Sequence, residues 1–466
     1  MQFIQSILDL GATIMMPIVL FLLALLFRQP VGKSLRHAVM VGVAFVGINA
    51  VLTAVLAIIG PAIQSLGTAM GIEALGTDIG WGLASAITWS FGWAALIIPI
   101  GFVVNWILLA FGWTKTFDAD IWNYWHWTFT AAITFIWTKN LILAFALAIV
   151  VEVITLKLGD WVSPLTQKYF GIPGTSLPHT ETVNWAPFNM AIEKAFLSKI
   201  PSLQKSKMDP EGIRKKVGFW GEPMMLGLYI GLGLGVLVWA VAKEPATIIL
   251  QMGIAVPAMI YLEGRMIGIL IDGLMPIADG VRDAFQRSER FKDREILIGI
   301  DAGPIGLSNP ASVVVGMVGM VIYLLLTMFF PAFFKIMPLA DLYLVPIFYM
   351  FAAAASKGNL WKTLINGTIT SVLVLFLTTS FAQPLTEAAA YVNYALPAGM
   401  VLVSNLDSGA NVLPWMIIMI VVGIFTGQPK LIIAPAIIAA LWIFCWIYAK
   451  DMPERLTKEL EEAENS

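Results

Sequence analysis

The sequence has little charge for its length. Only 12% of its 466 residues are Asp, Glu, Lys or Arg, whereas 59% are hydrophobic and the mean hydropathy is +0.83. A soluble domain carries about 25% charged residues, so the composition excludes an ordinary soluble protein and predicts a surface that faces lipid. The net charge of −2, without a dominant basic stripe, excludes a nucleic-acid partner.

Cysteine and soluble catalytic motifs are also scarce. The one cysteine, Cys445, lies in an apolar run, which excludes a disulfide, a cysteine-based metal cluster and a phosphocysteine carrier domain in this chain. A Walker loop, a dinucleotide fingerprint, Gly-x-Ser-x-Gly and His-Glu-x-x-His are all missing. We therefore expect no cofactor and no metal site, and any uphill transport must draw on an ion or a partner protein.

Long apolar runs take the place of these features. Each approaches the roughly 20 residues that a membrane-spanning helix needs, and the first run is too long for a cleavable signal. We predict an all-α polytopic membrane protein of about 10–11 transmembrane helices. The predicted spans are Ile4–Phe27, Ala38–Ile59, Phe91–Phe111, Asn140–Leu158, Pro223–Ala242, Thr247–Glu263, Pro310–Phe330, Asp341–Ala355, Thr363–Phe381, Leu413–Phe425 and Leu431–Ala449.

Basic residues gather in a few connections between these runs. The positive-inside rule places the connections in the cytoplasm and the N-terminus outside. In one of them, Arg265–Arg294, polar residues recur at intervals of three, four or seven opposite apolar ones. This period predicts a helix that lies in the membrane interface, with a plain surface connector as the alternative. Residues 1–450 are expected to form one membrane unit, and residues 451–466 a short charged tail.

Four segments are apolar but poor in helix-forming residues. Non-helical backbone at membrane depth must be surrounded by protein or must line a water-filled cavity, and transporters use such segments to present polar groups to a substrate. We predict re-entrant hairpins here, with extramembrane loops as the alternative. The segments are Gly60–Trp89, Gly171–Pro187, Gly299–Pro310 and Pro384–Trp415.

A weak internal repeat appears when each residue is aligned with the one 329 positions later. Pro17–Ile18 then matches Pro346–Ile347, Arg28 matches Lys357, and Lys33–Leu35 matches Lys362–Leu364. Duplication of this kind is common in transporters. Chance similarity between apolar helices is the alternative, and the alignment does not show whether the halves are inverted.

Ionisable groups within a bilayer are costly, so they mark candidate sites. His126 shares one helical face with Trp122 and Thr130, and an aromatic wall with an imidazole and a hydroxyl suits a sugar alcohol. An interfacial aromatic belt would give the same pattern.

Three further candidates lie in the broken segments. His179 lies in a polar loop, and Asp301 and Asp407 lie among small and apolar residues, where an Asp can instead be a cap or turn former. The residues predict a carrier for a small polar solute. Alternatives are an ion-coupled transporter, with Asp301 or Asp407 as the coupling acid, and an intramembrane transferase using His179.

Several motifs carry a family resemblance over nearly the whole chain: Ile7–Gly11, Asp120–Asn123, Trp125–His126, Lys157–Trp161, Leu177–His179, Gly218–Pro223 and Leu297–Asp301. The chain resembles the membrane subunit, enzyme IIC, of the galactitol family of the bacterial phosphoenolpyruvate-dependent phosphotransferase system. Ascorbate permeases are more distant relatives.

The resemblance implies a homodimer in the bacterial inner membrane, with a substrate-binding core domain that moves elevator-fashion against a V-shaped dimerisation domain. A phosphocysteine on a separate enzyme IIB, charged by enzyme IIA, would phosphorylate the solute, and His179 or Asp301 would take the hydroxyl proton. Departures at Thr180–Thr182, Ala302–Pro304 and Ser308–Asn309 leave the identity of the polyol open. The implied substrate contacts, with those from the broken segments, are His126, Thr130, His179, Thr180, Asp301, Asn309 and Asp407.

Overall fold

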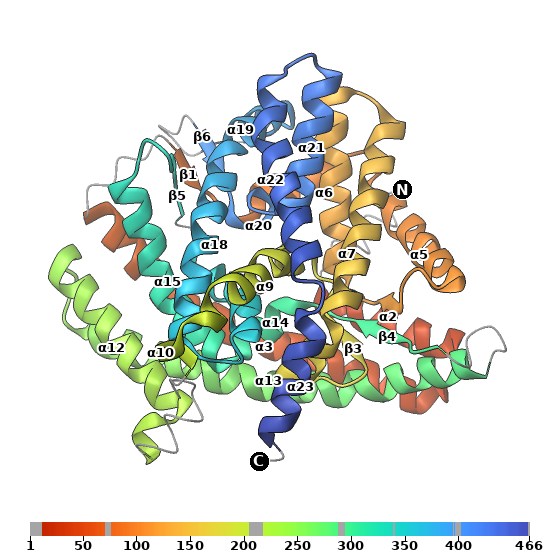
Figure 1. The fold of residues 1–466 in the computed structure, drawn as a ribbon, viewed down its shortest axis with the longest axis horizontal. Helices are drawn as coiled ribbons and strands as arrows, with labels where there is room; N and C mark the ends of the chain where they lie inside the picture. Colours follow the sequence, from red (N-terminus) through yellow and green to blue (C-terminus); the bar gives the residue numbers. More distant parts are fainter. Residues whose placement is uncertain are drawn as a thin grey trace.

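The computed structural model describes residues 12–69, 76–204, 218–287, 294–338, 341–394, 396 and 402–464. The described chain is predominantly helical, with a few very short strands (Figure 1). Within it, four helical stretches are long and apolar enough to cross a membrane, and several shorter apolar helices accompany them. The four are Leu141–Phe170, Pro310–Phe329, Leu360–Tyr391 and Lys430–Tyr448.

Every predicted apolar run falls on helical structure wherever the structure describes it. Residues 4–11 of the first run lie outside the described part, and the run Asp341–Ala355 is divided into η3 (Leu342–Leu344), α16 (Val345–Phe348) and α17 (Met350–Ala355). The other runs correspond to α2 (Ala12–Leu26), α3 (Val31–Ala69), α5 (Ala94–Phe111), α7 (Leu141–Phe170), α12 (Pro223–Ala242), α13 (Thr247–Gln286), α15 (Pro310–Phe329), α18 (Leu360–Ser380), α21 (Val412–Phe425) and α22 (Lys430–Tyr448).

Two of these helices are much longer than predicted. Helix α13 continues without a break to Gln286, so the helix predicted within Arg265–Arg294 is joined to the preceding run, and its placement in the membrane interface stays a prediction. Helix α3 likewise continues to Ala69, through the start of a segment predicted to be broken. Both helices contain proline, which removes one backbone hydrogen bond but need not end a helix that is packed on both sides. The two pack along each other.

Helix α6 (Ile121–Thr138) is an additional helix that the hydropathy pattern missed. It packs against α4 (Trp81–Ser90), α5, α7 and α21 and is almost wholly buried. Its polar residues lower the local hydropathy below that of a lipid-facing helix. They are tolerated because they face protein neighbours rather than lipid.

The expectation of an all-α fold is incomplete, because two small parallel sheets lie within the helical body. In the β1 sheet, β1 (Gly76–Asp78) lies between β5 (Ile336–Met337) and β6 (Leu402–Ser404). In the β4 sheet, β4 (Leu297–Gly299) lies between β2 (Thr116–Asp118) and β3 (Thr175–Ser176). Strands of two or three residues are too short to show the alternation by which strands are recognised.

Each predicted broken segment contains one of these strands followed by a helix. Strand β1 leads into α4, β3 into α8 (Thr180–Val183), β4 into α14 (Ala302–Ser308) and β6 into α20 (Leu406–Gly409). The sheets and short helices satisfy backbone groups that would otherwise be buried without partners. Their placement as re-entrant hairpins in a bilayer stays a prediction.

The proposed repeat has a structural counterpart at its basic turn. Arg28 (φ 59°) and Lys357 (φ 51°) are both left-handed residues that end a helix. The two turns also share a backbone hydrogen bond at equivalent positions. Arg28 N donates to Leu25 O, and Lys357 N donates to Ala354 O. The repeat beyond this turn stays a prediction.

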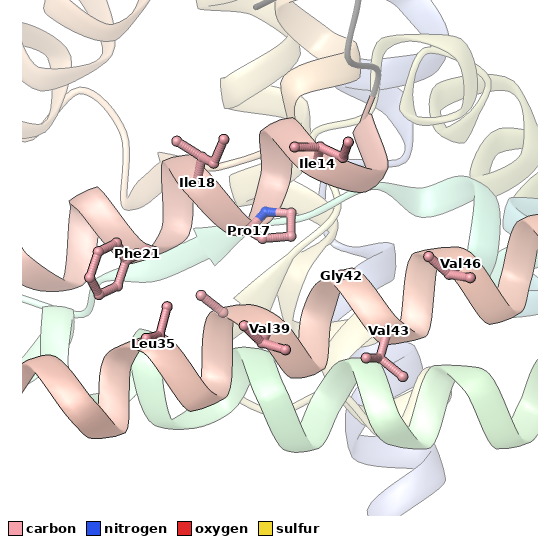
Figure 2. Close-up of a pocket in the computed structure, with 10 residues that line it drawn as sticks. Ile14, Pro17, Ile18, Phe21, Leu35, Val39, Gly42, Val43 and Val46 are labelled. Atoms are coloured by element: carbon pink, nitrogen blue, oxygen red, sulfur yellow. The ribbon is translucent and has the colours of Figure 1, made fainter.

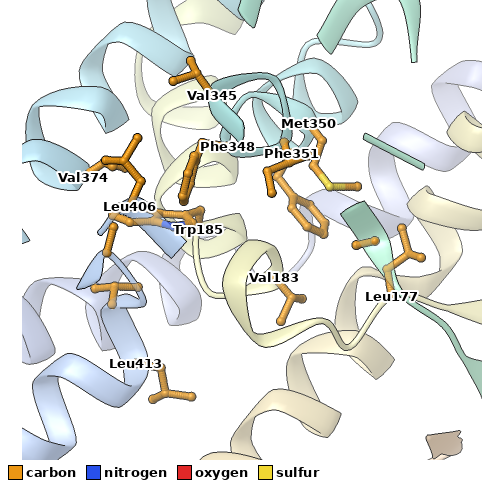
Figure 3. Packing of buried hydrophobic residues seen from close by; sticks show 14 of the residues in the cluster. Leu177, Val183, Trp185, Val345, Phe348, Met350, Phe351, Val374, Leu406 and Leu413 are labelled. Atoms are coloured by element: carbon orange, nitrogen blue, oxygen red, sulfur yellow. The ribbon is translucent and has the colours of Figure 1, made fainter. Parts of the chain in front are cut away.

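The remaining helices surround this frame and bury a large apolar core. Trp185, Phe348 and Leu406 meet in that core, which joins the elements after β3, β5 and β6 (Figure 3). The predicted charged tail forms helix α23, which packs on α7. The helices not yet given are α9 (Ala186–Ala195), η1 (Leu197–Lys199), α10 (Pro201–Gln204), η2 (Gly218–Gly221), α19 (Ala382–Tyr391) and α23 (Met452–Glu464).

Candidate functional site

The candidate site forms where the three strands of the β4 sheet end. Asp120 follows β2, His179 follows β3 and Asp301 follows β4, and each is the N-cap of the next helix. Carboxyl ends of parallel strands commonly hold ligands, because neighbouring chains diverge there. The sheet thus brings together residues from three distant parts of the sequence.

His179 lies at the centre of this group. Its Nδ1 is 2.6 Å from Asp120 Oδ2 and 3.5 Å from Asp301 Oδ1, and its Nε2 is 3.7 Å from Glu181 Oε2. All four side chains are buried. We call Asp120, His179, Glu181 and Asp301 the His179 cluster.

Both aspartates of the cluster are helix caps as well as partners of His179. Asp120 Oδ1 accepts a hydrogen bond from Trp122 N at 2.9 Å, and Asp301 Oδ1 accepts one from Gly303 N at 2.8 Å. An N-cap carboxylate satisfies free N–H groups at a helix start. The capping role and the site role therefore coexist at Asp301.

Asn123 holds the loop that carries His179. Its Oδ1 accepts from Thr180 N at 2.8 Å and from Thr180 Oγ1 at 2.9 Å. Its Nδ2 donates to Pro178 O at 2.8 Å and to Asp118 Oδ2 at 2.9 Å. Since an amide offers two donors and one acceptor oxygen, Asn123 commits its whole capacity to fixing this loop against α6.

His126 links the cluster to the other sheet. Its ring centroid is 5.3 Å from that of His179. Its Nε2 lies 3.9 Å from Asp407 Oδ1, and its Nδ1 lies 3.4 Å from Asn411 Nδ2. Asp407 and Asn411 follow β6, so the candidate site lies between the ends of both sheets.

Small differences in exposure separate the residues that face accessible space from those behind them. Asp301 is 9% exposed, Asp407 7% and Glu181 5%, whereas Thr130 and Thr180 are 0% exposed. The three carboxyl side chains keep a small accessible surface. The two hydroxyls lie deeper in the protein.

The three remaining polar candidates have protein partners in the structure. Thr130 Oγ1 donates to His126 O at 3.0 Å, and Thr180 Oγ1 bonds Asn123. Asn309 Oδ1 caps α15 through Ser312 N at 3.0 Å. The structure therefore gives these residues supporting contacts, and their direct contact with substrate stays a prediction.

Sequence reasoning did not single out Asp120, Asn123, Glu181 or Asn411 as site residues. The first two stand in the motif Asp120–Asn123 and were treated only as family markers. A polar side chain at each end of this apolar motif could have indicated site residues. Glu181 was treated as a departure from the family pattern. Its charge within a segment predicted to lie at membrane depth was the signal for a site residue.

Two sets of side chains come close enough to suggest metal binding, and both include His179. Their ligand atoms lie within 4.8 Å of one another. The 2.6 Å contact between His179 and Asp120 has hydrogen-bond length. We interpret the set with Asp120 as a hydrogen-bonded ion pair and the set with Glu181 as a longer-range pair, and the absence of a metal site stays a prediction.

The β1 sheet ends in a second group of acids. Asp78 Oδ1 accepts from Gly80 N at 2.9 Å, and Asp78 Oδ2 accepts from Asp341 N at 2.7 Å. Asp341 Oδ2 lies 3.5 Å from Asp407 N. These buried carboxylates are held by backbone N–H groups.

Comparison with known proteins identifies the family. The family model EIIC-GAT, described as the PTS system sugar-specific permease component, matches residues 6–399. The chain belongs to this family. The EIIC-GAT resemblance predicted from the sequence is thereby confirmed, and the whole His179 cluster lies within the matched residues.

Two relatives of this EIIC-GAT permease component align along nearly the whole chain. A putative permease IIC component of Escherichia coli K12 is 32% identical over 438 residues, covering 94% of this chain and 97% of the relative. The PTS system galactitol-specific EIIC component of the same strain is 30% identical over 419 residues, covering 90% of each.

Proposed function

We propose that this permease component binds a sugar alcohol, galactitol or a related polyol, and carries it across the bacterial inner membrane as a multi-pass protein. A separate enzyme IIB, charged by enzyme IIA, phosphorylates the solute. The family and the galactitol-specific relative support the class of substrate. Within this class, the substrate can be galactitol or another pentitol or hexitol.

The observation that carries the proposal is a surplus of hydrogen-bond acceptors at the site. Glu181 Oε1 and Asn411 Oδ1 are buried without a hydrogen-bond partner among the described residues. An unsatisfied buried acceptor costs about 1–3 kcal/mol. Polyol hydroxyls supply the missing donors.

Charge and aromatic side chains favour a neutral polyol over a sugar acid. Asp301, Asp407 and Glu181 place their carboxyl groups around His126 and His179, so a substrate carboxylate would add like charge there. The Trp125 ring lies 5.0 Å from that of His126 and gives the C–H face of a polyol an apolar surface.

The chemistry of the proposed transfer needs one proton acceptor in the permease. A polyol hydroxyl attacks the phosphorus of the thiophosphate on enzyme IIB, a P–O bond forms, the P–S bond breaks and the cysteine leaves as thiolate. The hydroxyl proton passes to a side chain of the site. His179 and Asp301 are the two candidates that the sequence offers.

A division into a moving core and a dimer scaffold is part of the same proposal. Helices α2, α3, α12 and α13 pack chiefly on one another. An apolar groove runs along α2 and α3, lined by exposed Ile14, Ile18, Val39 and Val43 (Figure 2). We assign this groove to a second copy of the chain, against which the core moves elevator-fashion.

A cysteine cross-link tests the dimer, because Cys445 is the only native cysteine. The Cys445→Ser, Val43→Cys variant should give a cross-linked dimer in native membranes with a short bifunctional thiol reagent. Ile142→Cys, on the 84% exposed side chain of α7, is the matched control and should stay monomeric. Monomers from both variants would contradict the assignment.

Uptake by membrane vesicles tests the function. Labelled galactitol should accumulate as galactitol phosphate only when phosphorylated enzyme IIB is present on the cytoplasmic side. Unphosphorylated solute that accumulates with an ion gradient would instead support an ion-coupled transporter. If other polyols are taken up and phosphorylated in place of galactitol, the proposed mechanism stands and the proposed substrate is replaced.

A further inference from the structure

Both ring nitrogens of His179 face carboxylate oxygens. Nδ1 points to Asp120 and Asp301, and Nε2 points to Glu181. A neutral imidazole carries one N–H and one lone pair, so one nitrogen would set its lone pair against a carboxylate. Only the doubly protonated ring offers a donor on each side.

We propose that His179 is an imidazolium cation in the resting permease, and that it organises the cluster while Asp301 accepts the substrate proton. Asp120 is then a positioning residue, because it acts through His179. The protonation state of His179 follows from geometry alone. The role of Asp301 rests on the proposed function.

The charges around His179 agree with this assignment. Asp120 and His126 face it from α6, Glu181 from α8 and Asp301 from α14. Asp118 and Asp407 are further carboxyl groups that interact with His179 at longer range. Burial disfavours a charged imidazole, but each carboxylate within about 4–6 Å favours it. Three carboxylates within 3.7 Å of the ring outweigh one neighbouring histidine.

Asp301 is the carboxylate of the cluster best placed to accept a proton. Asp120 is 0% exposed, and its oxygens already bond Trp122 N and His179. Asp301 is the most exposed of the four, and its described contacts to Gly303 N and His179 both use Oδ1. Oδ2 is therefore the oxygen that remains to accept a proton from a substrate hydroxyl.

Nitrogen-15 NMR of the full-length protein tests the protonation state directly. The chain has only three histidines, so ring-labelled protein in lipid nanodiscs gives three sets of signals, which His37→Gln and His126→Gln assign. We expect both His179 nitrogens at imidazolium shifts at about pH 7, where a free histidine is mostly neutral. One protonated and one bare ring nitrogen at about pH 7 would overturn the proposal.

Two buried carboxylates provide a matched pair of variants for this spectrum. Asp120→Asn keeps an N-cap but removes the charge, and should lower the titration midpoint of His179 by about one pH unit or more. Asp160→Asn removes a buried carboxylate that bonds Thr114 and Thr116 instead, and should leave the midpoint unchanged. Equal effects of both variants would refute the positioning role of Asp120.

The pH profile of phosphorylation identifies the proton acceptor. His179→Gln should lower the rate at least tenfold yet keep the loss of activity at acid pH, because Asp301 remains. Asp301→Asn should remove that acid limb. If His179→Gln removes it, His179 is the base. The NMR result is independent of substrate, so a failure of polyol transport would leave the imidazolium assignment standing.

Discussion

The β1 and β4 sheets are built alike but hold their acids differently. Each has three parallel strands and collects aspartates where the strands end. In the β1 sheet, Asp78 is held by the N–H groups of Gly80 and Asp341. In the β4 sheet, Asp120 and Asp301 share the ring of His179.

The difference shows what one histidine adds to a common scaffold. In the β1 sheet one backbone donor to Asp78 lies in the same turn, at Gly80, and the other comes from a distant segment, at Asp341, so together they fix this carboxylate in the fold. A side-chain donor reaches across three chain segments, so it can hold acids that also face a ligand. We infer that the β1 sheet is mainly structural and that the β4 sheet carries the chemistry, with Asp407 lying between them.

Among the variants, Asp301→Asn should have the largest effect. It tests whether the β4 sheet, unlike the β1 sheet, carries the chemistry. Loss of the proton acceptor should lower polyol phosphorylation by about 10²–10⁴-fold, while polyol binding without enzyme IIB is retained. Rates of phosphate formation and equilibrium dialysis with labelled polyol measure the two. A loss of binding equal to the loss of rate would show that Asp301 only holds substrate.

His179→Ala should destabilise the fold most. It leaves three buried carboxylates without their cation, and breaking a buried ion pair costs about 3–5 kcal/mol. Thermal unfolding in nanodiscs should show this loss at about pH 7, whereas His37→Ala should show little. Equal destabilisation by the two variants would mean that the cluster is not a cationic centre.

Asn123→Ala tests how much a supporting amide stabilises the β4 sheet compared with the β1 sheet. It removes four hydrogen bonds around the His179 loop and should cost about 2–3 kcal/mol. The matched variant in the β1 sheet is Asn405→Ala, which removes one described bond from Gly409 N and should cost about 1 kcal/mol. Denaturant-induced unfolding measures both losses of stability. A larger loss in Asn405→Ala than in Asn123→Ala would contradict the expectation.

Asp78→Asn tests the structural interpretation of the β1 sheet. An amide keeps one of the two acceptor oxygens, so unfolding should become easier by about 1 kcal/mol. The rate of phosphorylation and its pH profile should match the unaltered protein. A shifted pH profile would place the β1 sheet in the proton path.

The smallest effect is expected away from both sheets, at α23. A hydrogen bond and ion pair with Lys194 lower the pKa of Asp451. The pair therefore stabilises the docked helix fully above the ordinary value of about 3.9 and is lost as the pH falls through the lower folded value. Proteolysis of the C-terminus should quicken slightly in Lys194→Ala at about pH 7 and not below about pH 3.

The sequence predicted most of the helices well because long apolar runs are typical of helices that cross a membrane. It also singled out His126, His179, Asp301 and Asp407, which the fold brings together, since rare ionisable groups stand out in an apolar chain. It did not predict the sheets, because strands of two or three residues have no period. Asp120 escaped notice because only the fold brings it against the ring of His179.

The lengths of α3 and α13 have a mechanical consequence. At 1.5 Å per residue, helices of 39 and 40 residues extend about 60 Å, twice the thickness of the hydrocarbon layer. Figure 1 shows α13 running across the direction of α7 and α22. If α7 and α22 cross the bilayer, α13 must lie strongly inclined to the membrane normal, and its length then runs along the membrane rather than through it.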